Sequence, residues 1–132
     1  MPPTVLLADD DPAILALIQN LIDGEFLVVG AFLSGEEVLR AHAKLNPEVI
    51  VLDISMPSIS GFEVARRLRQ QGCNTRIVFI TLHEQPEFIS TALALGALGY
   101  VIKSRAGSDL VPAIRAALSG QVFVSSHNNL SQ

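Results

Sequence analysis

The sequence predicts an α/β domain in which a single parallel sheet carries helices on both faces. Short runs of apolar, largely β-branched residues alternate five times with segments of helical periodicity. The connections between them are short, and right-handed crossovers leave few topologies other than one open parallel sheet. With 132 residues, of which 49% are hydrophobic, the chain is long enough for one domain with a substantial core.

The first half of the chain contains three predicted strands, at residues 4–8, 26–32 and 48–53. Asp11 followed by Pro12 is typical of a helix start, and Gly24 is the expected stop of this helix. Its buried stripe is expected to be Ile14, Leu17, Ile18 and Leu21. Ser34 and Glu37 form a capping box that opens a second helix, which extends to about Lys44.

The second half continues the alternation. A helix is predicted at residues 62–71, a strand at 76–81, a helix between Pro86 and Gly96, and a strand at 99–102. Ser108 or Asp109 is expected to cap a last helix that ends near Ser119. Residues 1–120 are therefore predicted to be the folded domain, and residues 121–132 a tail or linker.

Functional side chains follow four of the five predicted strands. Asp9 and Asp10 come after the first strand, Asp53 ends the third, Thr81 ends the fourth and Lys103 follows the fifth. Carboxyl ends of parallel strands share one edge of the sheet, where ligands bind. A dinucleotide site is excluded, because acidic residues occupy the first turn, where a glycine-rich phosphate loop would be required.

Three carboxylates at one edge repel one another unless a cation neutralises them. Magnesium suits such a site, since it binds one or two carboxylates and leaves positions for a phosphoryl oxygen. Asp53 could then attack a phosphorus atom to form an aspartyl phosphate, with Thr81 and Lys103 contacting the phosphoryl oxygens. A single Asp at a strand end is, however, more often a loop cap.

The motifs LLADDDP, VIVLDISMPSISG, FIT and GALGYVIK, in this order, resemble a response-regulator receiver domain over residues 5 to about 118. The resemblance implies a flavodoxin-like (βα)5 three-layer sandwich with strand order 2-1-3-4-5. It also implies that Mg²⁺ or Mn²⁺ is held by Asp9, Asp10, Asp53 and the backbone carbonyl of Ser55. By the same resemblance, Thr81 and Tyr100 are the switch residues, although Tyr100 could instead be a half-buried strand residue with no such role.

The resemblance implies that a sensor histidine kinase phosphorylates Asp53 and that the chain is not an enzyme beyond slow self-catalysed phosphorylation and dephosphorylation. GALGYVIK and GQVFVSS are similar to receivers of LuxR-like, NarL-type regulators, in which a DNA-binding helix-turn-helix domain would follow and control transcription. The alternative is a pseudo-receiver that binds proteins without phosphorylation, which Leu82 after the threonine leaves open. An aspartate-based phosphatase would need a second Asp where Ser55 stands.

The composition excludes other classes. A net charge of −4 without a dense basic run argues against nucleic-acid binding. The lone Cys73 fits a reducing compartment, and the sequence has neither a basic n-region nor an apolar stretch of about 18 residues. We therefore expect a cytoplasmic protein that does not enter membranes. His42, His83 and His127 lack the spacing of metal ligands.

The first and last helices carry surplus apolar residues, namely Leu15 and Ile22 in one and Val111 and Leu118 in the other. These residues either pack on the sheet and on one another or form a partner surface, most simply of a homodimer. The face formed by the fourth helix and the fifth strand is a second candidate interface. Asp11 is expected to be a helix cap only, and the bond from Lys103 to Ser104 is expected to be trans.

Overall fold

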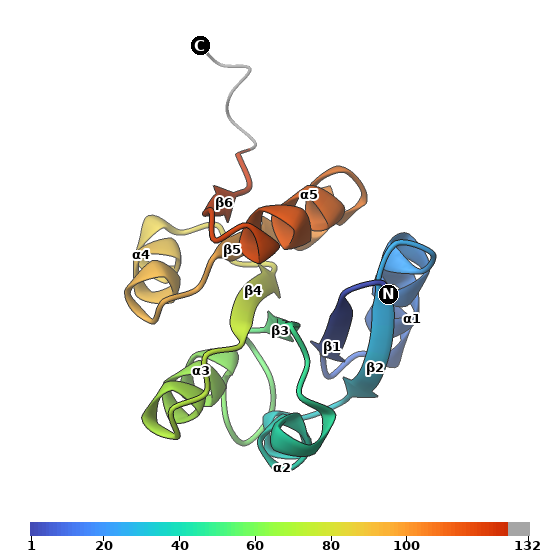
Figure 1. Ribbon diagram of the computed structural model, residues 1–132. Helices are drawn as coiled ribbons and strands as arrows, with labels where there is room; N and C mark the ends of the chain where they lie inside the picture. Colours follow the sequence, from blue (N-terminus) through green and yellow to red (C-terminus); the bar gives the residue numbers. More distant parts are fainter. Residues whose placement is uncertain (127–132) are drawn as a thin grey trace.

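A parallel sheet with the strand order β2-β1-β3-β4-β5-β6 forms the centre of the protein (Figure 1). The computed structural model describes residues 1–126. The strands are β1 (Thr4–Ala8), β2 (Leu27–Phe32), β3 (Val49–Asp53), β4 (Arg76–Thr81), β5 (Gly99–Ile102) and β6 (Phe123–Val124). The predicted flavodoxin-like order 2-1-3-4-5 is confirmed, with β6 added at one edge.

Helices cover both faces of the sheet. They are α1 (Pro12–Ile22), α2 (Gly35–Leu45), α3 (Gly61–Gln70), α4 (Pro86–Ala94) and α5 (Ala106–Leu118). Side chains of α1 and α5 share one core cluster with the sheet, and those of α2, α3 and α4 share the other (Figure 1). The three-layer sandwich is therefore as predicted.

The two core clusters arise from the alternation of side chains along each strand. In β3, Val49 and Val51 point to the α1 and α5 layer, whereas Ile50 and Leu52 point to the opposite layer. All five β3 residues, including Asp53, are buried. The central strand is thus held on both faces, and this fixes the position of Asp53 at its carboxyl end.

Two predicted helix caps are confirmed. The Asp11 side chain accepts a hydrogen bond from the Ala13 N–H at 2.9 Å. The Ser34 hydroxyl accepts one from the Glu37 N–H at 3.3 Å, and this opens α2. These caps satisfy backbone donors that the first helical turn leaves free.

The predicted buried stripe of α1 is partly confirmed, because Ile18 is buried and Ile14 and Leu21 pack against the core, but it is wrong at Leu17 and omits Leu15 and Ile22. Leu15, Ile18 and Ile22 are its buried residues, and Leu17 is 51% exposed. The helix packs against α5, and its buried residues share one core cluster with α5 and the sheet. Leu15 and Ile22 consequently belong to the core and are not available to a partner.

The predicted cap of the last helix is also wrong. A 3-10 turn at Lys103–Arg105 leads directly into α5 at Ala106, and Arg105 is the N-cap residue without a side-chain bond. The Asp109 carboxylate is instead bonded to Arg105 at 3.0 Å. The Lys103–Ser104 peptide bond is trans, as predicted.

Strand β6 lies within the segment that was predicted to be a tail. It pairs in parallel with β5, through the Phe123 N–H to Leu98 O at 2.9 Å and the Ser125 N–H to Tyr100 O at 2.8 Å. The Ser125 hydroxyl also donates to Asp109 Oδ2 at 2.7 Å and accepts from the Ile102 N–H at 3.1 Å. The rest of the predicted tail, residues 127–132 with His127, lies outside the described residues.

Candidate functional site

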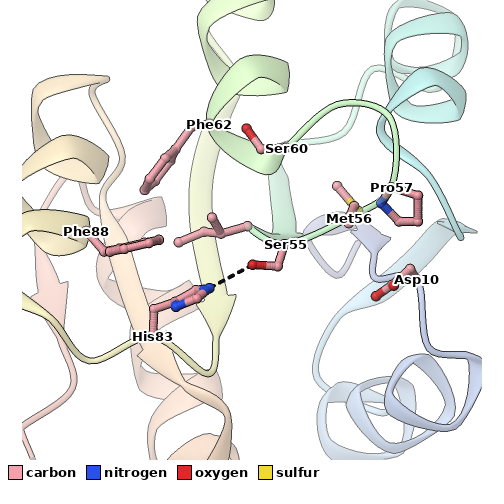
Figure 2. Close-up of a pocket in the computed structure, with 9 residues that line it drawn as sticks. Asp10, Ser55, Met56, Pro57, Ser60, Phe62, His83 and Phe88 are labelled. Atoms are coloured by element: carbon pink, nitrogen blue, oxygen red, sulfur yellow. Dashed lines mark hydrogen bonds between the residues drawn. The ribbon is translucent and has the colours of Figure 1, made fainter.

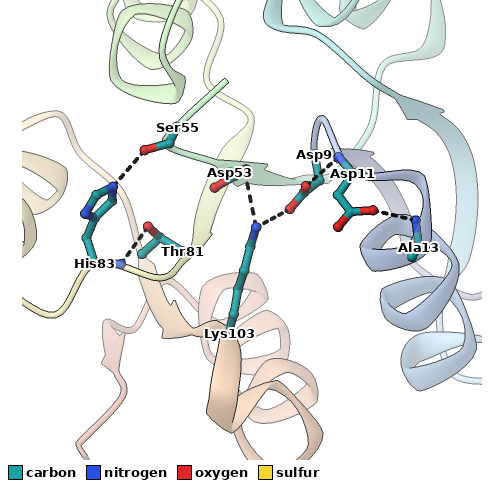
Figure 3. Close-up of polar contacts among 8 residues, drawn as sticks. All are labelled: Asp9, Asp11, Ala13, Asp53, Ser55, Thr81, His83 and Lys103. Carbon is teal, nitrogen blue, oxygen red and sulfur yellow. Dashed lines mark hydrogen bonds and ion pairs between the residues drawn. The ribbon is translucent and has the colours of Figure 1, made fainter. Parts of the chain in front are cut away.

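The carboxyl ends of β1, β3, β4 and β5 bring the predicted site residues to one edge of the sheet (Figure 3). They surround a hollow of about 380 Å³. Its lining residues are Asp10, Asp11, Asp53, Ser55, Thr81, Leu82, His83 and Lys103. Residues up to 93 positions apart in the sequence, such as Asp10 and Lys103, thus line one cavity.

Three carboxylates form an acidic cluster in this site. One oxygen from each of Asp9, Asp10 and Asp53 lies within 4.8 Å of the others. Asp9 and Asp53 are buried, at 0% and 3% exposure, whereas Asp10 is exposed. Asp9 Oδ1 accepts the Asp11 N–H at 2.9 Å, but Asp9 Oδ2 is buried and has no hydrogen-bond partner. A buried carboxylate oxygen that accepts no hydrogen bond, with two other carboxylates close by, suits a hard divalent cation.

Lys103 supplies the positive charge of the site. Its Nζ lies 2.7 Å from Asp9 Oδ2, as an ion pair without hydrogen-bond geometry, and 3.3 Å from Asp53 Oδ2. Burial lowers the pKa of Lys103, but the interactions with Asp9 and Asp53 outweigh it and raise that pKa above its usual value. The ammonium therefore stays charged and partly neutralises the carboxylates.

The Asp53 carboxyl has an unusual pKa. Burial and the neighbouring Asp9 charge raise it to about 6, although Lys103 and a backbone hydrogen bond from Ser55 act in the opposite direction. Such a shift is typical of functional carboxylates, because a structural role rarely requires a buried charge beside another of the same sign. Cation binding at the cluster would favour the ionised form.

The loop between β3 and α3 is held close to Asp53. The Gly61 N–H donates to Ile54 O at 2.7 Å, and a Cβ at position 61 would lie 2.1 Å from Asp53 O. Only glycine allows this approach. The Ser55 hydroxyl makes a 2.7 Å hydrogen bond with His83 Nε2, which ties this loop to the one after β4.

Thr81 and Tyr100 are both connected to His83. The Thr81 hydroxyl oxygen accepts the His83 N–H at 3.1 Å, and the Tyr100 hydroxyl donates to the His83 carbonyl at 2.8 Å. Tyr100 is fully buried, and burial raises its pKa to about 12. Sequence reasoning missed the place of His83 in the site. Its position two residues after Thr81 is the one signal that could have revealed it.

Leu82 lines the hollow and is 73% exposed. A second hollow, of about 570 Å³, lies between the β3–α3 loop and α4 (Figure 2). Phe62, His83 and Phe88 line it, and the rings of His83 and Phe88 are stacked with centroids 4.2 Å apart.

Residues 5–115 match the family described as the response regulator receiver domain. This chain belongs to that family. The match spans every element from β1 to most of α5, and so includes all four strand ends that form the acidic site.

The receiver is similar to regulators that are longer than this chain. It is 34% identical over 126 residues to the nitrate/nitrite response regulator protein NarL of Escherichia coli strain K12, covering 94% of this chain and 58% of NarL. It is 36% identical over 119 residues to the transcriptional regulatory protein YvfU of Bacillus subtilis, covering 89% of this chain and 60% of YvfU. The receiver thus spans less than two thirds of the curated relatives it matches.

Solved structures confirm the fold. A LuxR-family response regulator from Aurantimonas sp. SI85-9A1 aligns with a TM-score of 0.88 at 31% identity, over 93% of this chain and 89% of that one. The isolated REC domain of RcsB from Salmonella enterica serovar Typhimurium, with the phosphomimetic BeF3-, aligns with a TM-score of 0.87 at 27% identity, over 96% and 95% of the chains. Within residues 1–126 of the receiver, every helix is too short or too polar to cross a bilayer.

Proposed function

We propose that this receiver accepts a phosphoryl group on Asp53 from a sensor histidine kinase in a reaction that requires Mg²⁺ or Mn²⁺. The observation that carries the proposal is the environment of Asp53. Its carboxylate is buried, faces a hollow and shares the Lys103 ammonium with the buried carboxylate of Asp9. This arrangement costs folding free energy in the absence of a ligand and therefore indicates a binding role.

The reaction is a displacement at phosphorus. A carboxylate oxygen of Asp53 forms the new P–O bond while the P–N bond to the kinase histidine breaks, and the electron pair of that bond returns to the imidazole. In this proposal the Lys103 ammonium, which lies 3.3 Å from Asp53 Oδ2, and the Thr81 hydroxyl donate to the phosphoryl oxygens of the product. We propose that the chain itself supplies at most slow self-catalysed phosphorylation and dephosphorylation.

Asp9, Asp10, Asp53 and the backbone carbonyl of Ser55 are the proposed metal ligands. The buried Asp9 Oδ2, which pairs with Lys103 but accepts no hydrogen bond, and the 4.8 Å spacing of the carboxylate oxygens support this set. The metal ion, when bound, screens the charge of the incoming phosphoryl group.

The proposed output is a change in the surface near α4 and β5. Thr81 and Tyr100 meet at the His83 backbone, so movement of Thr81 toward a phosphoryl group would disturb the hydrogen bond of Tyr100. Because the relatives include a transcriptional regulatory protein of greater length, we propose that this receiver, which extends past the predicted boundary at residue 120 to include β6, belongs to a regulator whose DNA-binding domain follows a linker. A homodimer through α1 and α5, or through α4 and β5, would join two such domains.

The pseudo-receiver alternative would require the site to have lost a reacting group. Asp53, Thr81, Lys103 and the acidic pair are all present and lie together, which does not favour that alternative.

Reduction of the phosphorylated protein with borohydride tests the assignment to Asp53, because an acyl phosphate is converted to an alcohol. After incubation with acetyl phosphate and Mg²⁺, the peptide that contains Asp53 should carry a homoserine. Conversion of a different aspartate, such as Asp10, would contradict the proposal.

A further inference from the structure

His83 contacts four different parts of the site. Its backbone N–H donates to Thr81 Oγ1 at 3.1 Å, and its carbonyl accepts the Tyr100 hydroxyl at 2.8 Å. Its imidazole Nε2 lies 2.7 Å from Ser55 Oγ, and its ring stacks on Phe88 at an interplanar angle of 16° (Figures 2 and 3). The first two contacts use backbone groups that every residue except proline has, whereas the last two require the imidazole.

Through its hydrogen bond to Ser55, the His83 imidazole contacts a residue that belongs to the Asp53 site. The backbone of Ser55 makes a hydrogen bond to the Asp53 carboxylate, and the Ser55 carbonyl is a proposed metal ligand. A ligand that shifts the Ser55 backbone must therefore either shift the His83 imidazole as well or break the hydrogen bond between the Ser55 hydroxyl and His83 Nε2.

The Ser55–His83 hydrogen bond also stands between two hollows. The hollow of about 380 Å³ contains Asp53, and the one of about 570 Å³ is lined by Phe62 and Phe88. Both hollows include Ser55 and His83 in their walls. Figure 2 shows the bond as the link between the β3–α3 loop and the segment that leads to α4.

We propose that the His83 imidazole is a positioning group that transmits occupancy of the metal site from Ser55 to Tyr100 and α4. The inference rests on the proposed function, since it needs a cation beside Asp53. Displacement of Ser55 moves the imidazole, the imidazole moves the His83 backbone, and the His83 carbonyl is the hydrogen-bond acceptor of Tyr100. The stack on Phe88 carries the same displacement to the first turn of α4.

This route differs from the one through Thr81. The Thr81 hydroxyl responds to a phosphoryl group, because it needs an acceptor oxygen to donate to. The Ser55 route responds to the cation alone. Mg²⁺ without any phosphodonor should therefore change the environment of Tyr100, and this change should depend on the imidazole.

Tyr100 can be observed directly, because the chain contains one tyrosine and no tryptophan. We would titrate the protein with Mg²⁺ alone and record tyrosine fluorescence, with the amide shifts of Asp9 and Asp10 in ¹⁵N spectra as an independent measure of binding. In the unmodified protein both signals should change with the same midpoint.

The variants His83→Ala and Ser55→Ala each remove one end of the side-chain hydrogen bond and keep the backbone groups. In each variant the fluorescence response is compared with that of the unmodified protein at equal Mg²⁺ occupancy, read from the Asp10 shifts. The coupling between the two signals should weaken by at least about threefold, as expected for the loss of one net hydrogen bond. The double variant should fall no further than either single one, because the two changes remove the same interaction. His83→Gln, which retains a side-chain amide, should recover part of the response.

Equal fluorescence responses in the unmodified protein and both single variants would overturn the inference, as would additive losses in the double variant. Shifts at Asp10 without any response of Tyr100 in the unmodified protein would overturn it and leave the proposed function intact. Absence of the Asp10 shifts would overturn the metal site of the proposed function and this coupling together.

Discussion

The Nζ atom of Lys103 lies 3.3 Å from Oδ2 of Asp53, although the two residues are 50 positions apart in the chain. The same ammonium lies 2.7 Å from Asp9 Oδ2. The positive charge of Lys103 thus partly neutralises the two carboxylates, as a metal ion would. The ammonium also lies close enough to Asp53 to donate a hydrogen bond to a phosphoryl group on that residue. These two roles predict opposite effects of removing its charge.

Lys103→Met should therefore bind Mg²⁺ more tightly, by about three- to tenfold, because a competing cation is removed from the acidic cluster. Phosphorylation by acetyl phosphate should nevertheless become slower, because the product loses a donor. Calorimetric titration and the rate of adduct formation check the two effects separately. Weaker Mg²⁺ binding in the variant would show that Lys103 organises the carboxylates and does not compete with the ion.

Asp53 should make the metal-free protein less stable as pH rises. Its pKa is about 6 in the folded protein, against an ordinary value of 3.8, so the folded state holds a proton that the unfolded state has lost. The stability that this group contributes is fully present below pH 3.8 and is lost as pH rises through 6. In EDTA at pH 7, Asp53→Asn should consequently be more stable by about 2 to 3 kcal/mol.

Urea unfolding at pH 4 and pH 7 measures this difference. The gain from Asp53→Asn should be small at pH 4, and added Mg²⁺ should stabilise the unmodified protein more than the variant at pH 7. A gain of equal size at both pH values would mean that ionisation of Asp53 is not its cause.

Gly61→Ala should disturb the site through its backbone. The added Cβ would lie 2.1 Å from Asp53 O, so the β3–α3 loop must move, at a cost of about 2 to 3 kcal/mol. Gly107→Ala is the matched control, because no atom lies within 4 Å of a Cβ there and the residue is inside α5. That change should stabilise the protein by up to about 1 kcal/mol. Similar unfolding midpoints for the two variants would refute the close contact.

Ser125→Ala should release β6 from the edge of the sheet. It removes the hydroxyl that joins Asp109 on α5 to the Ile102 N–H on β5, and should cost about 1 to 2 kcal/mol. The amides of Phe123 and Ser125 should then exchange with solvent faster, while those of β3 stay protected. Ser119→Ala, at an exposed position, is the control. Unchanged exchange at Phe123 would show that strand pairing alone holds β6.

Much of this architecture could be predicted from local sequence. The strands 4–8, 76–81 and 99–102 have their predicted bounds, because a buried parallel strand must be continuously apolar and a charged or hydroxyl residue marks its end. The same rule placed Asp9, Asp53, Thr81 and Lys103 at one edge. The caps at Asp11 and Ser34 were also predictable, because each cap side chain bonds to a backbone N–H three or fewer positions away.

The features that could not be predicted depend on contacts between distant segments. The burial of Leu15 and Ile22 on α1 depends on packing against α5. The Asp109 carboxylate bonds to Arg105 and Ser125 and does not cap α5. Strand β6 has two residues, too few for a periodic pattern, and the contact of His83 with Ser55 joins positions 28 apart. Local propensity carries no information on such pairs.

The central claim is that Asp53 is a Mg²⁺-dependent phosphoryl acceptor, and intact-mass analysis tests it most directly. The protein and its Asp53→Asn variant would be incubated with acetyl phosphate, each with Mg²⁺ and with EDTA, and quenched rapidly. We predict a single added phosphoryl group, of about 80 Da, in the unmodified protein with Mg²⁺ and in none of the other three samples. No adduct under any condition, or an adduct that persists in Asp53→Asn, would contradict the account.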